Sequence, residues 1–329
     1  MPYLNNIEIK KLIENKSIKS SSRIKKNQIQ PASLDLTLSN KCYRIKASFI
    51  PNEISISSIL KDLVLTQINL KNEFLFEKGC IYLCEINEKL NLPFDIKGKS
   101  NPKSTTGRLD IFTRIITEKG FEYDFIDYNY KGKLYLEIIP QSFSIKLKKD
   151  ISLNQIRFFK GKDNEVITRK QKISVSIKKG VVSAYKAKKI TSSISLGNIN
   201  FYQKDKYWEK IIPDDNFFII EKDEFYILRS KEKISIPTDN AAELEPFKDS
   251  FGNFRVHYAG FFDPGFGNIS GIPAVLELRA YDTPFIIRDG QLVGQLNYYE
   301  IKKVRSFSYG KSIKSNYHNQ SLKLAKQFR

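Results

Sequence analysis

The feature that most constrains this chain is an internal repeat. One block of the first half recurs 144 residues later, Phe74-Leu-Phe-Glu-Lys-Gly-Cys-Ile-Tyr-Leu matching Phe218-Ile-Ile-Glu-Lys-Asp-Glu-Phe-Tyr-Ile. Two later blocks recur at an offset of 140, Leu136-Glu-Ile matching Leu276-Glu-Leu and Leu153-Asn-Gln-Ile matching Val293-Gly-Gln-Leu. Blocks matched in the same order predict two copies of one domain. We place the copies at 1–160 and 185–329, with a lysine-rich linker at 161–184, which suits a length of 329 residues.

The repeat is built from segments that are typical of β-strands. They are short runs of β-branched and aromatic residues with Gly, Pro, Asn or Asp around them. The clearest are 74–76, 81–83, 133–139, 143–147, 225–228, 274–278 and 285–287. Apolar residues at helical spacing predict one short helix at 7–15, and a second is expected at 57–65. The sequence therefore predicts a mainly all-β fold with few short helices.

The charge of the chain is strongly positive, since 55 Lys and Arg oppose 36 Asp and Glu for a net charge of +19. The lysines are spread along the whole chain together with many Ile and Asn, and compositional drift explains that spread equally well. We therefore predict no nucleic-acid partner, and a smaller polyanionic ligand remains open. No apolar run approaches the roughly 18 residues that span a bilayer, and the first residues lack a signal-peptide core. We expect a cytoplasmic protein with no membrane partner.

The cysteines and histidines do not form a metal-binding pattern. Cys80 and Cys84 lie in an apolar segment without a histidine nearby, and Cys42 stands apart. His257 and His318 are isolated from each other and from the cysteines. We expect free thiols and no protein-bound zinc.

One turn of the first half collects cations and hydroxyl groups. It runs from Gly98 to Arg108 and contains Lys103 and Ser104. These side chains, with backbone N–H groups of a turn, could hold phosphate oxygens by charge-assisted hydrogen bonds. The order of residues is not that of a Walker loop, and a solvated polar loop is the alternative.

The second half carries a carboxylate inside an apolar strand. Glu277 lies in Ala274-Val-Leu-Glu-Leu, and Glu137 occupies the equivalent place in the first half. Alternation on a half-exposed strand would leave such a group solvated. Its presence in both diverged copies favours a special position. Upstream, Asp263-Pro264-Gly265 predicts a tight turn.

Four short elements, spread over nearly the whole chain, resemble one family. They are the run Val256-His-Tyr-Ala-Gly-Phe-Phe-Asp-Pro-Gly-Phe with Val275-Leu-Glu, the pattern Ser104-x-x-x-Arg108-Leu109, the run Ile29-Gln-Pro-Ala-Ser-Leu-Asp-Leu, and the tail from Tyr309 to Gln320. Together they resemble the pyrimidine-pocket hairpin, phosphate-binding element, N-terminal signature and nucleotide-covering tail of the dCTP deaminases, in a long, duplicated form. That family belongs to the dUTPase-like superfamily, so the resemblance implies two tandem dUTPase-like domains of β-barrel or jelly-roll-like form.

The resemblance also implies a reaction and a set of site residues. The reaction is the zinc-independent hydrolysis of dCTP to dUTP and ammonia, which supplies dUTP for thymidylate synthesis. A glutamate serves as proton shuttle, and the resemblance leaves open whether it is Glu277 or Glu137. Arg108 would bind phosphate or orient that glutamate. The implied substrate contacts are Lys103, Ser104, Arg108, His257, Ala259, Asp263, Tyr309 and Gln320. Lys103, Ser104 and Arg108 of the first half are expected to meet the hairpin of the second half.

The resemblance further implies which small molecules the chain binds and that it associates with copies of itself. Mg²⁺ would arrive with the triphosphate and not through protein ligands. The family's inhibitor dTTP is an expected second ligand, and the chain is expected to form a homo-oligomer.

The chain departs from the family in ways that keep other functions open. The second half lacks an arginine where the first half has Arg108, and the tail has Asn316 where the family commonly has lysine. The segment from Asp127 to Gly132, which contains Tyr130, resembles the water-activating element of dUTPases. A dUTP diphosphatase, or an enzyme with both activities, is therefore one alternative. A catalytically silent nucleotide-binding regulator is the other.

Overall fold

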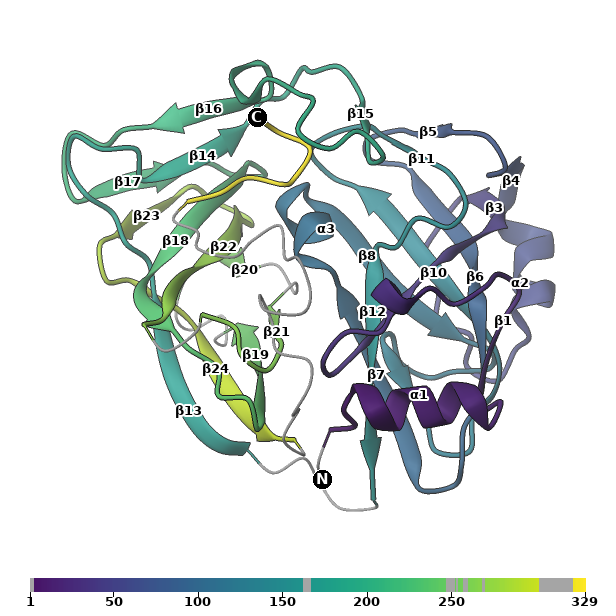
Figure 1. Ribbon diagram of the computed structural model, residues 1–329. Coiled ribbons are helices and arrows are strands. Elements are labelled where there is room, and N and C mark those ends of the chain that lie inside the picture. Colours follow the sequence, from purple (N-terminus) through teal and green to yellow (C-terminus); the bar gives the residue numbers. More distant parts are fainter. Residues whose placement is uncertain are drawn as a thin grey trace.

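Strands dominate the computed structural model, which describes residues 3–161, 167–246, 252, 254–256, 260–267, 270–301 and 322–329 (Figure 1). Three short α-helices occur in this described part: α1 (Asn6–Glu14), α2 (Ile56–Leu63) and α3 (Ser104–Arg108). The mainly all-β prediction is confirmed. No helix in these ranges is long and apolar enough to cross a membrane.

The first two helices lie where the sequence predicts helices. In α1, Asn5 caps the first turn by accepting from the N–H groups of Ile7 and Glu8, and the Glu8 side chain accepts from the N–H of Asn5. Its buried face includes Ile9 and Leu12. The third helix, α3, was not expected, because its five residues are too few to show an apolar period.

Three sheets are built mainly from the first half, and one of them adds β15, a strand at 194–195 from the second half. Their strand orders are β4-β3-β6-β10-β8 with β1 beside β6, then β2-β12-β7-β9, and finally β15-β11-β5. The strands are β1 (Ile18–Ser20), β2 (Leu34–Leu36), β3 (Leu38–Ile45), β4 (Val64–Asn69), β5 (Phe74–Phe76), β6 (Ile81–Asn91), β7 (Ile96–Pro102), β8 (Ile111–Thr117), β9 (Phe125–Ile126), β10 (Lys131–Pro140), β11 (Ile145–Leu147), β12 (Asn154–Lys160) and β15 (Ile194–Ser195).

The second half also contains three sheets. Their orders are β13-β24-β19-β21, β16-β14-β18-β22-β20 and β17-β23. The strands are β13 (Ile167–Ser174), β14 (Ala184–Ala187), β16 (Trp208–Ile211), β17 (Phe217–Ile220), β18 (Phe225–Ile234), β19 (Asn240–Pro246), β20 (Phe254–Val256), β21 (Phe261–Phe262), β22 (Ile272–Ala280), β23 (Phe285–Arg288) and β24 (Leu292–Glu300).

The sequence repeat reappears as a repeat of strand register. Glu137 of β10 lies opposite Leu83 of β6, and Glu277 of β22 lies opposite Ile227 of β18. The offsets of these partners are the same 140 and 144 residues that align the sequences. A register slip of one residue would turn every side chain to the other face, so equal registers mean that both copies bury equivalent positions.

The lysine-rich segment expected as a linker contains β13, which pairs with β24 at one edge of its sheet. Its burial pattern is exposed over most of its length. Lysine and arginine are common on edge strands because they discourage pairing with other chains. The basic composition of this segment is therefore compatible with an edge strand.

The two halves share a hydrophobic core. The larger core cluster runs through the first half and includes Trp208 of β16 and Ile227 of β18. Leu324 and Phe328 of the C-terminal segment belong to it as well, and the Phe328 ring lies 5.9 Å from that of Trp208. In Figure 1 this segment, drawn in yellow, lies above α3 between the halves. Packing, and not only the chain connection, therefore holds the halves together.

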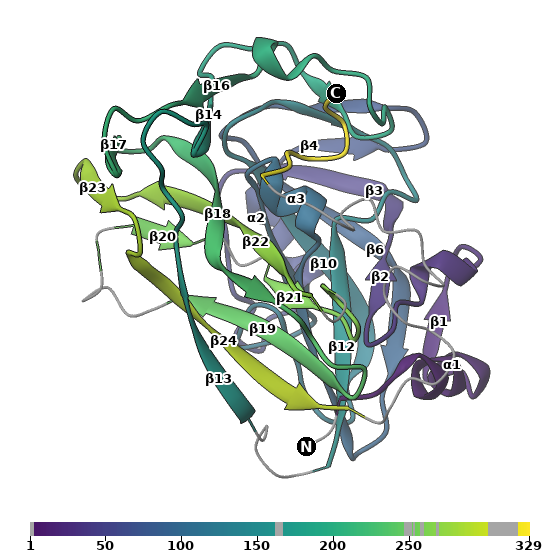
Figure 2. The ribbon, with the colours of Figure 1, turned by 60° about the vertical axis from the view of Figure 1, so that its left-hand side comes forward.

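A buried ion-pair cluster joins the facing sheets. Glu243 of β19 lies 3.1 Å from Arg157 of β12 and 3.1 Å from Lys99 of β7. In the ribbon views, β19 and β12 belong to the two halves that face each other (Figures 1 and 2). Burial alone would raise the pKa of Glu243, but Arg157 and Lys99 outweigh burial and lower it to about 2. The fully buried Arg157 guanidinium also lies 4.3 Å from the centre of the Phe261 ring.

We expect Glu243→Gln to destabilise the fold by about 3–5 kcal/mol at pH 7.5, because it removes the carboxylate that forms an ion pair with the buried Arg157 guanidinium. The measurement is urea unfolding followed by fluorescence. Because the folded pKa is depressed, the contribution of Glu243 is present above about pH 4.5 and decreases as the pH falls towards 2. The matched control is Glu77→Gln, which removes the exposed pair with Arg44 at 2.8 Å and should cost less than about 1 kcal/mol. Equal losses in the two variants would contradict the role given to Glu243.

Candidate functional site

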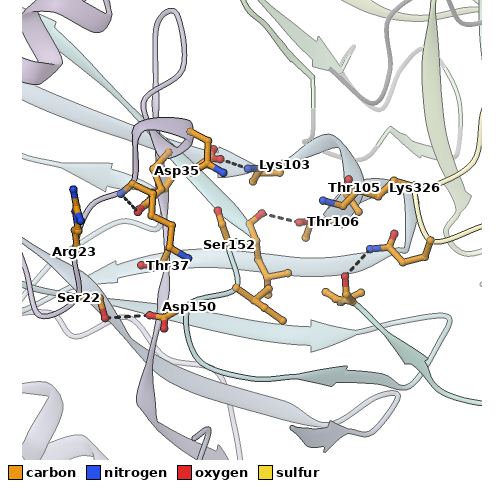
Figure 3. A pocket seen from close by; sticks show the side chains of 17 residues that line it. Ser22, Arg23, Asp35, Thr37, Lys103, Thr105, Thr106, Asp150, Ser152 and Lys326 are labelled. Atoms are coloured by element: carbon orange, nitrogen blue, oxygen red, sulfur yellow. Dashed lines mark hydrogen bonds and ion pairs between the residues drawn. The ribbon is translucent and has the colours of Figure 1, made fainter. Parts of the chain in front are cut away.

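The cationic turn of the first half is the helix α3, which connects β7 to β8. Lys103 precedes the helix, and its backbone N–H donates to the Leu153 carbonyl at 2.8 Å. The Thr106 hydroxyl donates to the same carbonyl at 2.7 Å. The Lys103 ammonium forms an ion pair with Asp35 of β2 (Figure 3). Ser104 is half-buried at the first helical position. The turn is therefore anchored to its own half from two sides.

Arg108 ends this helix and is nearly buried. Its Nη1 donates to the Lys323 carbonyl of the C-terminal segment at 2.8 Å. Its charge also acts on Glu277 of the second half and favours the ionised form of that carboxyl. The structure thus brings Arg108 and Glu277 together from the two halves, as the resemblance predicts.

Glu277 is a buried carboxyl with a shifted pKa. It lies within β22 with 6% of its surface exposed. Burial raises its pKa to about 8, Arg108 opposes this rise, and Asp110 adds to it. A carboxyl with a pKa near neutrality can both accept and return a proton at physiological pH. The position is chemically suited to general acid–base catalysis.

A second inter-half contact lies beside Glu277. Asp110, directly after α3, forms an ion pair with Arg279 of β22 and accepts from the Ser142 hydroxyl at 2.6 Å. Arg279 stands two residues beyond Glu277 on the same face of the strand. Asp110 and Arg279 were not predicted as site residues. Only the folded chain brings them together, because 169 positions separate them in sequence.

Asp263 lies at the start of the predicted Asp-Pro-Gly turn. Gly265 has a φ of 85°, a left-handed value that favours glycine. The backbone N–H of Ala32 in the first half donates to Asp263 at 3.3 Å. Burial raises the pKa of Asp263 to about 7, and the neighbouring Asp35 adds to this rise. Asp263 therefore lies next to Asp35 and Lys103, so the hairpin meets the cationic turn of the first half.

The equivalent carboxylate of the first half has different surroundings. Glu137 of β10 accepts from Arg114 of β8, at 2.9 Å from Nε and 2.6 Å from Nη2. The Arg114 guanidinium lies 3.7 Å from the centre of the Tyr123 ring and 4.8 Å from that of Phe112. Glu137 is therefore held in an ion pair by an arginine that itself packs against aromatic rings.

The segment that resembles the dUTPase element lies at the other end of β7. Ile126 pairs with Gly98, so Asp127 follows opposite Lys97, and six residues of β7 at about 3.3 Å each put roughly 20 Å between Lys97 and Lys103. Asp127 is exposed. The Tyr130 hydroxyl accepts from the N–H of Glu118 at 3.0 Å and donates to the Lys133 carbonyl. Within one chain, this segment does not meet the cationic turn.

Four predicted contacts lie outside the described residues: His257, Ala259, Tyr309 and Gln320. The described ranges hold no group of three or more His, Cys, Asp or Glu placed to bind a metal ion. Cys42 and Cys84 are buried free thiols, and the free thiol of Cys80 is half-buried.

The comparisons with known proteins agree with each other. The family model "2'-deoxycytidine 5'-triphosphate deaminase (DCD) N-terminal domain" matches residues 3–162, and the corresponding C-terminal domain model matches 147–328. A solved 2'-deoxycytidine 5'-triphosphate deaminase from Agrobacterium tumefaciens is 36% identical with a TM-score of 0.87, and the match covers 92% of this chain and 99% of that one.

Curated relatives match shorter stretches. A "dCTP deaminase, dUMP-forming" from Nanoarchaeum equitans is 32% identical over 48% of this chain and 83% of its own length. The protein of the same name from Streptomyces avermitilis is 36% identical over 29% of this chain and 50% of its own length. Taken with the domain models and the solved structure, these matches show that the chain belongs to the 2'-deoxycytidine 5'-triphosphate deaminase family and is an enzyme of the deaminase class.

Proposed function

We propose that this chain hydrolyses dCTP to dUTP and ammonia at a site formed between its halves, with Glu277 as the proton shuttle. The observation that carries the proposal is the position of Glu277. It is a buried carboxyl with a pKa of about 8, and it faces Arg108 of the other half. A group of this kind is poised for proton transfer near neutral pH.

The proton transfers balance in two stages. The Glu277 carboxylate takes a proton from water while the water oxygen bonds to C4 of the cytosine, and it passes that proton to N3. It then takes the remaining hydroxyl proton and delivers it to the amino group. The C4–N bond breaks, ammonia leaves, and the C4 carbonyl of uracil forms. The carboxylate ends in the form in which it began, as a catalyst must.

The first-half residues are suited to the triphosphate. Lys103 and Arg108 supply positive charge, and the Ser104 hydroxyl adds a donor beside them. Asp263 is suited to accept from the deoxyribose hydroxyl, because it lies next to Lys103 and Ala32 in the same region. Arg108 has a second effect, since its charge keeps the pKa of Glu277 from rising further.

Contacts with neighbouring side chains favour Glu277 over Glu137 as the shuttle. Arg114 donates two charge-assisted hydrogen bonds to Glu137, so this carboxyl group is engaged in an ion pair within the fold. Glu277 instead feels Arg108 and Asp110 with opposite effects. A shuttle must hold a proton for part of the cycle, and the raised pKa of Glu277 allows this near neutral pH.

In this proposal, Mg²⁺ is bound to the substrate and not to protein ligands. Mg²⁺ prefers phosphate oxygens and water, and we expect it to accompany the triphosphate. The sequence lacks the His-x-Glu and Pro-Cys-x-x-Cys elements of zinc deaminases, which supports a zinc-independent reaction. Inhibition by dTTP and a homo-oligomeric state remain predictions from the family.

A second candidate function has a specific observation in its favour. The curated relatives carry the name "dCTP deaminase, dUMP-forming", so an enzyme of this family can release pyrophosphate as well as ammonia. The solved long relative carries only the name of a deaminase. The distance of Asp127 from the cationic turn favours deamination alone for a single chain.

We expect Glu277→Gln to lose at least about 1,000-fold in turnover and to keep dCTP binding, because the amide cannot shuttle a proton. In the wild type, kcat/KM should rise with pH towards about 8, as the carboxylate forms. The measurement is ammonia release across pH 6–9. The matched control is Glu137→Gln, which should stay active while it loses stability. An active Glu277→Gln with an inactive Glu137→Gln would assign catalysis to the first half.

The same variant should be more stable than the wild type. The pKa of Glu277 is higher in the folded state than in the unfolded state. This group therefore lowers the free energy of unfolding of the wild type, beginning near pH 4.5, where the unfolded group ionises, and reaching its full effect above about pH 8. The gain of Glu277→Gln should therefore reach a few kcal/mol at pH 8 and vanish towards pH 4.5. Unfolding in urea at both pH values measures it. A loss of stability at pH 8 would contradict the assigned pKa.

We expect Arg108→Ala to raise the KM for dCTP by about 10- to 100-fold, because a charge-assisted bond is worth about 1.5–3 kcal/mol. Removing this cation should also move the rising limb of the pH profile above pH 8, since Arg108 lowers the pKa of Glu277. Arg108→Lys, which keeps the charge, should retain the position of the limb. An unchanged KM and an unchanged limb in Arg108→Ala would rule out the composite site.

The two candidate functions differ in their products. Incubation of the chain with dCTP and Mg²⁺ should yield equal amounts of dUTP and ammonia without pyrophosphate. The assay separates the nucleotides and quantifies ammonia and pyrophosphate in the same sample. Accumulation of dUMP with pyrophosphate would establish the second activity, and binding of dCTP without any product would indicate a silent regulator.

A further inference from the structure

A cavity of about 480 Å³ lies beside α3 in the first half (Figure 3). Most of its lining comes from residues 22–28, from 103–106 at the start of α3, from 150–153 and from 326–327 in the C-terminal segment. Four cations line it: Arg23, Lys25, Lys103 and Lys326. Its volume falls in the range of small-molecule sites.

The lining of the cavity contains four cations and two carboxylates, Asp35 and Asp150. One Asp35 oxygen contacts Lys103, and Asp150 Oδ1 accepts from Ser22 and Asn87, each at 3.1 Å. Burial lowers the pKa of Lys326, the nearby Lys103 lowers it further, and Asp35 opposes this change. Two ammonium groups that destabilise each other beside a cavity make an anion there favourable.

Asp35 offers a complementary polar contact. The side chain is 5% exposed, and its Oδ1 is buried without a hydrogen bond from any described residue. A buried acceptor of this kind costs free energy until a donor reaches it. A hydroxyl group of a ligand would be such a donor.

Part of the cavity lining, here called the apolar floor, is made of apolar side chains. Ile151, Leu153 and Leu196 contribute to its lining. Leu196 directly follows β15, so the second half supplies part of the wall. A lining with both an apolar part and several cations suits a ligand that carries phosphate at one end and a ring or sugar at the other.

The cavity is distinct from the surroundings of Glu277. Thr105 and Thr106 of α3 line it, whereas Arg108, at the end of the same helix, acts on Glu277 and contacts Lys323. Neither Arg108 nor Glu277 belongs to the cavity lining. Lys103 is the shared boundary between the two places.

We propose that this cavity is a second binding site, which takes a phosphorylated ligand of up to nucleotide size. Lys326, Lys25 and Arg23 bind the phosphate oxygens, and Asp35 Oδ1 accepts from a ligand hydroxyl. The phosphate can be inorganic or belong to a nucleotide, and both share the chemistry that the cations recognise.

The test is titration calorimetry with inorganic tripolyphosphate as the probe. The full-length chain carries Glu277→Gln and is saturated with dCTP, so that the catalytic site is occupied and dCTP is not consumed. We expect saturable binding of tripolyphosphate, weakened at least about tenfold by adding Lys326→Met, because a charge-assisted contact is lost. The matched control is Lys170→Met, at an exposed lysine of β13, which should bind the probe as the parent does.

Two results would overturn the proposal. One is the loss of tripolyphosphate binding once dCTP is bound, which would show that the cavity takes only the substrate's own phosphates or nothing. The other is equal binding by the parent and Lys326→Met. Lys25→Met, at an exposed position, gives a second test if Lys326→Met melts below the parent. Tripolyphosphate binding can also be compared between Lys326→Met and the wild type without dCTP. This comparison tests the cavity even if the chain does not catalyse the proposed reaction.

Repeating the titration with ATP identifies the source of the phosphate. Tighter binding of ATP than of tripolyphosphate would indicate that the nucleoside contacts the apolar floor and Asp35. Equal binding would indicate a site for phosphate alone. Either result supports the cavity as an anion site, provided that Lys326→Met weakens both ligands.

Discussion

The buried contact of Glu243 with Arg157 and Lys99 is the interaction on which the rest of the structure depends. It holds the two facing sheets in one relative position, and the composite site requires that position. Lys99 and Glu243 stand 144 residues apart, so they are equivalent positions of the two copies that contact each other. A residue meets its own copy only near a symmetry axis, where identical lysines would repel. Duplication within one chain allows the two positions to diverge into opposite charges.

The same divergence separates the roles of the two repeated glutamates. Glu137 and Glu277 share a strand register, yet Arg114 forms an ion pair with the first, whereas burial is the largest influence on the pKa of the second. A carboxylate in a well-formed ion pair can stabilise a fold, whereas a buried carboxyl group with a raised pKa destabilises the fold when it is ionised. One copy can therefore serve stability while the other keeps a costly group for chemistry. In a chain with a single copy, the same residue would have to do both.

Local sequence patterns predict much of the fold, but they predict fewer of the contacts in the candidate site. The strands around 133–139 and 274–278, the first helix and the meeting of Arg108 with Glu277 were predictable from alternation, apolar spacing and family motifs. The contacts of Asp110 with Arg279, and of Lys326 with the cavity, were not. They join segments far apart in sequence, and no local period records which distant charges will meet. The state of Glu277 also depends on burial, which a half-exposed strand pattern did not indicate.

The C-terminal segment connects the parts that the repeat alone leaves separate. Phe328 packs in the first-half core, the Lys323 carbonyl accepts from Arg108, and Lys326 lines the cavity. Arg108 also lowers the pKa of Glu277. The hydrogen bond from Arg108 to Lys323 therefore links the packing of the eight terminal residues to the proposed proton shuttle. A carbonyl has no net charge, so it orients the guanidinium without cancelling its field. Arg108 can thus be held in place and still act on both phosphate and Glu277.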